Sequence, residues 1–137
     1  MDINFDLAVS NGRVFTPQGL KSIEIWIREG RIAALGGSHR AAERIDARGM
    51  LVLPGCIDAH VHFRDPGQTY KEDWLTGSVS AAAGGVSTVI DQPNTDPRTL
   101  DRRSFELKLQ SARARSVVDY CINGGPGRIE ELKKAGV

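Results

Sequence analysis

The sequence predicts an α/β protein whose N-terminal part is all-β. Two observations carry this prediction. Before Pro54-Gly55, short apolar runs are separated by turn residues, and after it strand patterns alternate with helix patterns. Strands that alternate with helices indicate parallel strands joined by helical crossovers. We therefore expect residues 1–54 to form a small β domain and residues 55–137 to form three β/α units.

The N-terminal part contains about five or six short strands. Ile23, Ile25 and Ile27 alternate with polar or aromatic neighbours, which is the period of a strand. Asn11-Gly12 stands between two apolar runs and predicts a hairpin. The expected strands are 6–9, 13–15, 23–27, 31–35, a short one at Ile45, and 50–53.

The C-terminal part begins with a strand from Gly55 to His62. Thr69 and Glu72 have the spacing of a capping box and predict a helix that ends at Ala83, before Gly84-Gly85. Further strands are expected at 86–90 and 116–122, and helices at 101–115 and 129–135. A closed eight-unit barrel needs about 250 residues. The chain is therefore either a small open sheet or a fragment, and the chemistry below favours a fragment.

Composition excludes several classes of function. The chain has 18 basic and 17 acidic residues and a net charge of +1, so it lacks the basic excess that binds nucleic acid. No apolar segment approaches the roughly 20 residues that span a bilayer. Residues 1–12 lack the basic and apolar regions of a secretory signal, and we expect a cytoplasmic protein. Cys56 and Cys121 lie far apart and are expected to be reduced, buried thiols.

The segment from Asp58 to Arg64 carries the strongest chemical signal. Alternate side chains of a strand share a face, so His60 and His62 should point together into the protein, with Asp58 and Arg64 beside them. Two imidazoles at this spacing can bind one divalent ion. The alternative is a surface strand that shows polar residues to water. A parallel strand covered on both faces has no such surface, which favours a metal site.

Two other polar residues are candidates for binding a substrate. Arg64 follows the strand, and its planar guanidinium matches a carboxylate, although a surface ion pair with Asp65 or Asp73 is equally consistent with the sequence. Asn94 follows the second strand and could hold a carboxylate or ring amide, or could be a turn residue. Asp58 could orient a histidine or be a satisfied core acid.

Residues 54–97 resemble dihydroorotases of the amidohydrolase superfamily. The resemblance rests on DAHVHFRDPG, AAAGGVSTV and the PNT loop, and it extends loosely over residues 1–53. It implies the N-terminal portion of a (β/α)8 TIM-like metal-dependent hydrolase barrel, preceded by a small β-sandwich domain. It also implies zinc-dependent, reversible hydrolysis of dihydroorotate to N-carbamoyl-L-aspartate in pyrimidine synthesis.

The resemblance assigns roles to four residues. His60 and His62 become ligands of one or two zinc ions, and Arg64 and Asn94 bind the substrate carboxylate. The bridging ligand, further histidines and the acid–base aspartate are expected beyond residue 137, so no acid–base group is assigned within this chain and the chain alone is expected to be inactive.

Two alternatives remain open from the sequence. One is a related cyclic amidohydrolase, such as an allantoinase or dihydropyrimidinase, against which the FRDPG stretch and Asn94 argue. Another is a non-catalytic scaffold for a partner such as aspartate carbamoyltransferase, against which the retained His60, His62 and Arg64 argue. The oligomeric state, including a homodimer, is open.

Overall fold

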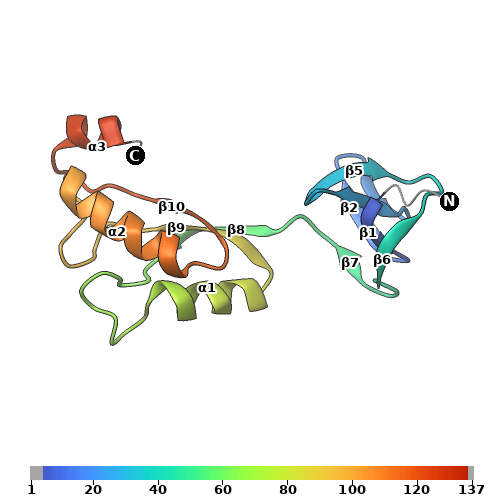
Figure 1. The fold of residues 1–137 in the computed structure, drawn as a ribbon, viewed down its shortest axis with the longest axis horizontal. Coiled ribbons are helices and arrows are strands. Elements are labelled where there is room, and N and C mark those ends of the chain that lie inside the picture. The colour runs from blue at the N-terminus through green and yellow to red at the C-terminus, as the bar shows by residue number, and fades with distance from the viewer. Residues whose placement is uncertain (1–4, 136–137) are drawn as a thin grey trace. The chain divides into compact units, whose positions relative to one another are not determined.

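The computed structural model describes residues 5–135 and divides into two compact units, Met1–Pro54 and Gly55–Val137 (Figure 1). Strands alone form the first unit, and alternating strands and helices form the second among the described residues. No helix within residues 5–135 has the length and apolar character needed to cross a membrane.

The first unit contains two sheets. One sheet has the order β5-β4-β1-β6 and the other has the order β3-β2-β7. The strands are β1 (Phe5–Ser10), β2 (Arg13–Thr16), β3 (Gly19–Lys21), β4 (Ile25–Arg28), β5 (Arg31–Leu35), β6 (Ala41–Asp46) and β7 (Leu51–Val52). Phe5, Ala8 and Trp26 form the buried core cluster of this unit, and the Trp26 Nε1–H donates to the Gly36 carbonyl at 2.9 Å.

The hairpin predicted at Asn11-Gly12 is wrong. β1 pairs with β4 and β6, whereas β2 lies in the other sheet, so the turn is a corner between sheets. The Asn11 side chain donates to Asp46 at 2.8 Å, which ties the corner to the end of β6. A Cβ on Gly12 would lie 2.6 Å from Val52, so this corner needs glycine for close approach, whereas Asn11, with φ 65°, provides the left-handed turn.

The second unit is a parallel three-stranded sheet of order β10-β9-β8. Its elements are β8 (Cys56–Val61), α1 (Trp74–Ala83), β9 (Val86–Asp91), α2 (Arg102–Arg115), β10 (Asp119–Ile122) and α3 (Ile129–Ala135). Its core joins sheet and helices through Phe63, Trp74, Val89, Phe105, Ala112, Ile122 and Leu132.

The first helix begins later than the sequence predicted. The N-cap is Asp73, whose carboxylate accepts the Thr76 backbone amide at 2.8 Å, and the helix starts at Trp74. Thr69 lies in the turn before it. Asp73 has the extended backbone that an N-cap needs. The end at Ala83 is confirmed, because Gly84 is the C-cap.

Strand β8 is exposed along its length, contrary to the expectation of an enclosed strand. Its burial is low because it is the edge of a three-stranded sheet among the described residues. Ile57, a large apolar residue of this strand, is 67% exposed. Cys56 and Cys121 are also exposed, so the prediction of buried thiols is wrong.

Candidate metal centre

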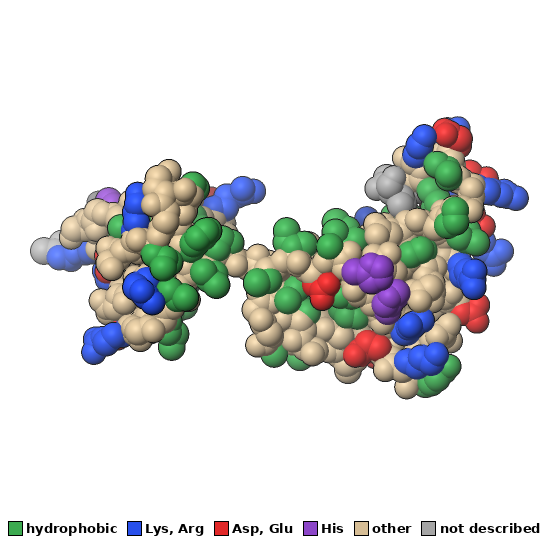
Figure 2. All heavy atoms as spheres, turned by 180° about the vertical axis from the view of Figure 1, so that it is seen from behind, with side chains coloured by type: hydrophobic (Ala, Val, Ile, Leu, Met, Phe, Trp, Pro, Cys, Tyr) green, Lys and Arg blue, Asp and Glu red, His purple; other side chains and the backbone are tan. Residues whose placement is uncertain are grey.

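His60 and His62 lie side by side at the carboxyl end of β8. Their ring centroids are 5.0 Å apart and the ring planes are inclined by 73°. Two adjoining histidines are visible on one face of this unit in Figure 2. The alternation of a strand brings them together, because residues two apart share a face. Both histidines are exposed, so the expectation that their strand is covered on both faces is not met among the described residues.

Asn94 adds a third polar group to the pair. His62 Nδ1 lies 2.7 Å from Asn94 Oδ1. An amide oxygen can only accept, so Nδ1 carries the hydrogen and the Nε2 lone pair of His62 is left for a ligand bond. The amide nitrogen of Asn94 keeps its own N–H donors. One asparagine can therefore fix the histidine tautomer and still donate to an anion.

Arg64 sits where the chain turns away from the sheet. Its φ is 62°, in the left-handed region that a residue with a Cβ rarely adopts, and Gln68 N–H donates to its carbonyl at 2.9 Å. Among residues 5–135, the carboxylates of Asp65 and Asp73 pair with Arg115, at 3.4 and 4.0 Å, and not with Arg64. The surface ion pair considered for Arg64 is therefore not formed.

The loops that carry Arg64 and Asn94 are bound to each other. Asp96 N–H donates to the Pro66 carbonyl at 3.1 Å. Gly67 has φ 93°, and a Cβ there would lie 2.0 Å from the Asp96 carbonyl oxygen, so only glycine permits this approach. Buried Thr95 donates its hydroxyl to the Pro97 carbonyl at 2.9 Å and stiffens the second loop.

Asp58 makes a local contact. Its Oδ1 accepts the His60 backbone amide at 3.1 Å, and the side chain is exposed. It is therefore not a core acid. Its hydrogen bond acts on the backbone of a predicted ligand and not on the imidazole.

A buried ion pair that contacts the backbone next to His62 was not predicted from the sequence. Asp91 and Lys108 form an ion pair whose side chains are both fully buried. Asp91 Oδ1 accepts the Phe63 backbone amide at 2.7 Å, and Lys108 Nζ donates to the Gln92 carbonyl at 2.5 Å. Apart from the Lys108 ammonium, the structure gives Asp91 Oδ2 no hydrogen-bond donor within residues 5–135.

Burial lowers the pKa of Lys108 from its ordinary value, and the charge and hydrogen bond of Asp91, with a smaller contribution from Asp65, oppose that shift. A signal for this pair was present in the sequence. Lys108 stands three residues after Phe105 and four before Ala112, on the stripe of α2 that faces the core. A lysine at such a position needs a buried partner.

The donors present suit part of a metal site. In the described part of the chain no group of three or more His, Cys, Asp or Glu side chains could hold a metal ion. Two adjacent exposed imidazoles, one with its Nδ1 hydrogen assigned, supply two nitrogen ligands of the four that zinc usually takes. The residues fit a metal whose other ligands come from elsewhere.

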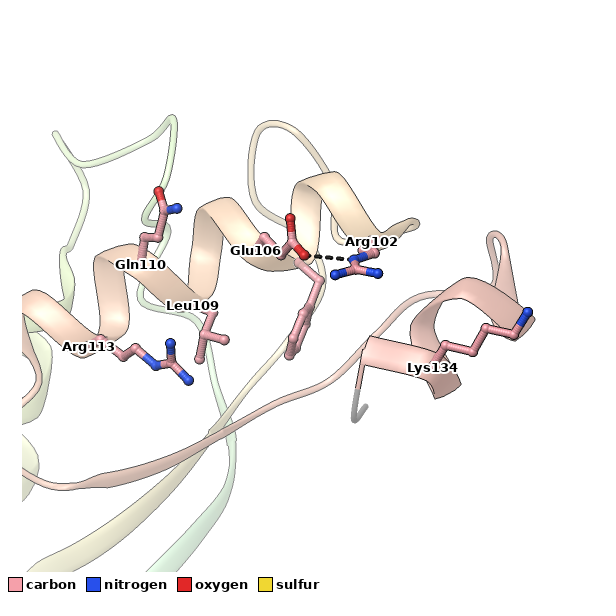
Figure 3. Close-up of a pocket in the computed structure, with 7 residues that line it drawn as sticks. Arg102, Glu106, Leu109, Gln110, Arg113 and Lys134 are labelled. Carbon is pink, nitrogen blue, oxygen red and sulfur yellow. Dashed lines mark hydrogen bonds and ion pairs between the residues drawn. The ribbon is translucent and has the colours of Figure 1, made fainter.

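A hollow of about 310 Å³ borders His62, Phe63 and Gly77. Another, of about 380 Å³, lies between α2 and α3 and is lined by basic side chains that include Arg102 and Arg113 (Figure 3). This second hollow contains none of the predicted site residues.

The sequence profile of the amidohydrolase family matches residues 51–135, which is more than half of the chain. The chain belongs to the amidohydrolase family. Members of this family are generally metal-dependent hydrolases, which agrees with the histidine pair at the carboxyl end of β8, inside the matched region.

Within this family, the chain is similar to dihydroorotases and to allantoinases. The chain is 53% identical over 133 residues to the dihydroorotase of Methanosarcina mazei, with 94% of this chain and 29% of the relative covered. It is 45% identical over 141 residues to the allantoinase of Rubrobacter xylanophilus, with 97% and 31% covered. The resemblance to dihydroorotases is confirmed.

Among solved structures, L-hydantoinase (dihydropyrimidinase) from Arthrobacter aurescens superposes with a TM-score of 0.87 at 34% identity, with 96% of this chain and 31% of that chain covered. The predicted fold class, the opening β/α units of a barrel hydrolase after a small β domain, is therefore confirmed. The chain spans about a third of the length of these amidohydrolases.

Proposed function

We propose that this amidohydrolase chain contributes His60 and His62 as zinc ligands, and Arg64 and Asn94 as carboxylate-binding groups, to a dihydroorotase. The observation that carries the proposal is the pair of imidazoles 5.0 Å apart, with Asn94 hydrogen-bonded to one of them at 2.7 Å. The 53% identity to a dihydroorotase supports the choice of substrate. The reaction is the reversible opening of the cyclic amide of dihydroorotate to N-carbamoyl-L-aspartate.

Each residue has a distinct task in this reaction. The Arg64 guanidinium binds the substrate carboxylate through two parallel hydrogen bonds, and the free amide N–H groups of Asn94 donate to the same carboxylate. These contacts orient the ring so that its amide carbonyl faces the histidines. A zinc ion bound there would lower the pKa of its water and polarise that carbonyl. Nε2 of His62 is available because Asn94 holds Nδ1 in its protonated form.

The left-handed backbone conformation of Arg64 supports its role in binding the substrate. A residue is held at φ 62° only where its surroundings impose that conformation, and such residues cluster at functional sites. Here the turn closed by Gln68 and the contact of Gly67 with Asp96 impose it. The turn therefore positions the arginine relative to Asn94 on the neighbouring loop.

The experiment assays the intact protein that contains this chain on dihydroorotate, allantoin and hydantoin, with metal content measured after purification. We expect bound zinc and hydrolysis of dihydroorotate. His60→Ala and His62→Ala should each lose metal and activity together, whereas Arg64→Met should keep the metal and raise KM for dihydroorotate. Arg102→Met, on an exposed face of α2, is the matched arginine control and should change neither.

Other outcomes separate the alternatives. Faster hydrolysis of allantoin or hydantoin than of dihydroorotate would assign the chain to those amidohydrolases, which the 45% identity to an allantoinase and the superposition on a hydantoinase make the second candidate. A folded, metal-free protein would instead favour a non-catalytic scaffold. Retention of metal in both histidine variants would refute the ligand assignment.

A further inference from the structure

The Asp91–Lys108 ion pair connects three segments of the second unit. Asp91 ends β9, Lys108 lies on α2, and the Asp91 carboxylate accepts the backbone amide of Phe63 at 2.7 Å. Phe63 directly follows His62. The Lys108 ammonium also donates to the carbonyl of Gln92, two residues before Asn94. The pair thus contacts the backbone next to a predicted metal ligand and next to the loop of Asn94.

Its location distinguishes this pair from the other ion pairs of the described chain. Both side chains have 0% exposure, whereas Arg102 and Glu106 of the exposed pair on the same helix are 64% and 49% exposed (Figure 3). Removing two charges from water is costly, and apolar residues of similar size often serve stability equally well. Stability alone therefore does not explain why a charged pair occupies this position. Its contacts with the backbone beside His62 and near Asn94 suggest a role in positioning.

We propose that Asp91 and Lys108 are positioning residues that hold His62 and Asn94 in register with each other. Asp91 fixes the chain just after β8 through the Phe63 amide, and Lys108 fixes the chain just after β9 through the Gln92 carbonyl. Because the Asp91 carboxylate and the Lys108 ammonium form an ion pair, the ends of β8 and β9 are joined through these two side chains. The 2.7 Å hydrogen bond between His62 and Asn94 depends on that join. The proposal rests on the proposed function for the roles of His62 in binding metal and of Asn94 in binding substrate.

The test compares two double variants in the intact protein. Asp91→Leu with Lys108→Met replaces the pair by apolar residues of similar shape and removes both backbone contacts. Asp91→Asn with Lys108→Gln removes the charges but keeps an oxygen acceptor and an N–H donor. Arg102→Met with Glu106→Gln removes the exposed pair on the same helix and is the control.

Two measurements are made without metal. They are the hydrogen exchange rate of the Phe63 amide and the imidazole nitrogen resonances of His62, which are assigned with His62→Gln. We expect slow exchange and a protonated Nδ1 in the wild type. The apolar variant should show fast exchange and lose the Nδ1 signature, and the amide variant should restore both. A third measurement, the dissociation constant for Co²⁺, should rise at least about tenfold in the apolar variant and recover in the amide variant.

The outcomes separate this proposal from the proposed function. Unchanged Phe63 exchange and His62 resonances in a folded apolar variant would overturn the positioning role, and so would changed exchange with unchanged Co²⁺ affinity. If the apolar variant does not fold, the wild type decides, because fast exchange at Phe63 would overturn the role. A wild type that binds no Co²⁺ and opens no cyclic amide, yet shows the expected metal-free pattern, refutes the proposed function and leaves the join between the strand ends intact.

Discussion

Substitution of Gly77 by alanine should destabilise the second unit even though alanine favours helices. Gly77 is a buried residue of α1. A Cβ at this position would lie 2.5 Å from two ring carbons of Phe63 and 3.1 Å from a third. Carbon atoms pack at about 3.5–4.0 Å, so the ring or the helix must move by about 1 Å.

The ring has little freedom to move. Phe63 is 6% exposed, and its ring forms a T-shaped pair with Trp74, with centroids 5.1 Å apart. Trp74 is fully buried, and its indole N–H donates to the Asp65 carbonyl at 3.2 Å. Overpacking of this kind costs about 1–3 kcal/mol, and the helix propensity of alanine returns up to about 1 kcal/mol. We expect a net loss of about 1–2 kcal/mol.

The assay is urea unfolding of the wild type, Gly77→Ala and Gly84→Ala. Gly84 is the matched control, because a Cβ there would be 3.5 Å from the Ala81 carbonyl oxygen, an ordinary contact, and its φ of −85° suits any residue. Its change should be within about 0.5 kcal/mol. Because Phe63 follows His62, Gly77→Ala should also weaken metal binding. A Gly77→Ala protein as stable as the wild type, with unchanged metal affinity, would refute the reasoning from packing.

Further predictions follow from the charged and glycine positions. Lys108→Met alone leaves the buried Asp91 carboxylate without its cation and should cost about 3–5 kcal/mol in urea unfolding, more than the double replacement by apolar residues. Backbone amides lower the pKa of the N-cap residues Asp73 and Asp101, first through Thr76 and Ser104 respectively. Their stabilisation is therefore complete above the unfolded pKa of about 3.9 and is lost as pH falls through the lower folded pKa. Thermal unfolding should show a decline below about pH 4 that Asp101→Asn reduces, and an unaltered decline would contradict this assignment. Gly67→Ala should separate the two site loops and raise KM for the cyclic amide with little change in kcat, and equal kinetics would contradict the role of that contact.

Regular periodicity and helix ends made much of the second unit predictable. Asp101 was expected near the start of a helix that ends at about Arg115, and it is the N-cap of α2, which ends there. The alternation of His60 and His62 predicted that their side chains lie together, and their ring centroids are 5.0 Å apart, although both residues are exposed in the described part of the chain. Both features depend on neighbours within a few residues, which is the range over which sequence patterns carry information.

Features set by distant neighbours were less accessible. Asn11-Gly12 is a residue pair typical of hairpin turns. However, β1 pairs with β4 on one side and β6 on the other, so β2 cannot pair with it and lies in the other sheet. The ion pair joins Asp91 at the end of β9 to Lys108 on α2. The only sequence signal for it is the position of the lysine on the buried stripe of α2. The left-handed backbone of Arg64 had no sequence signal, because arginine is not a residue that favours it.

The order β8, β9, β10 is the same along the chain and across the sheet. During synthesis each new strand can therefore dock beside the one made just before it, with its crossover helix already available, and the unit can grow as it leaves the ribosome. The N-terminal unit has the opposite property. β1 lies between β4 and β6 and must wait for both, so the part of the protein that is made first cannot finish its sheet until β6 has emerged.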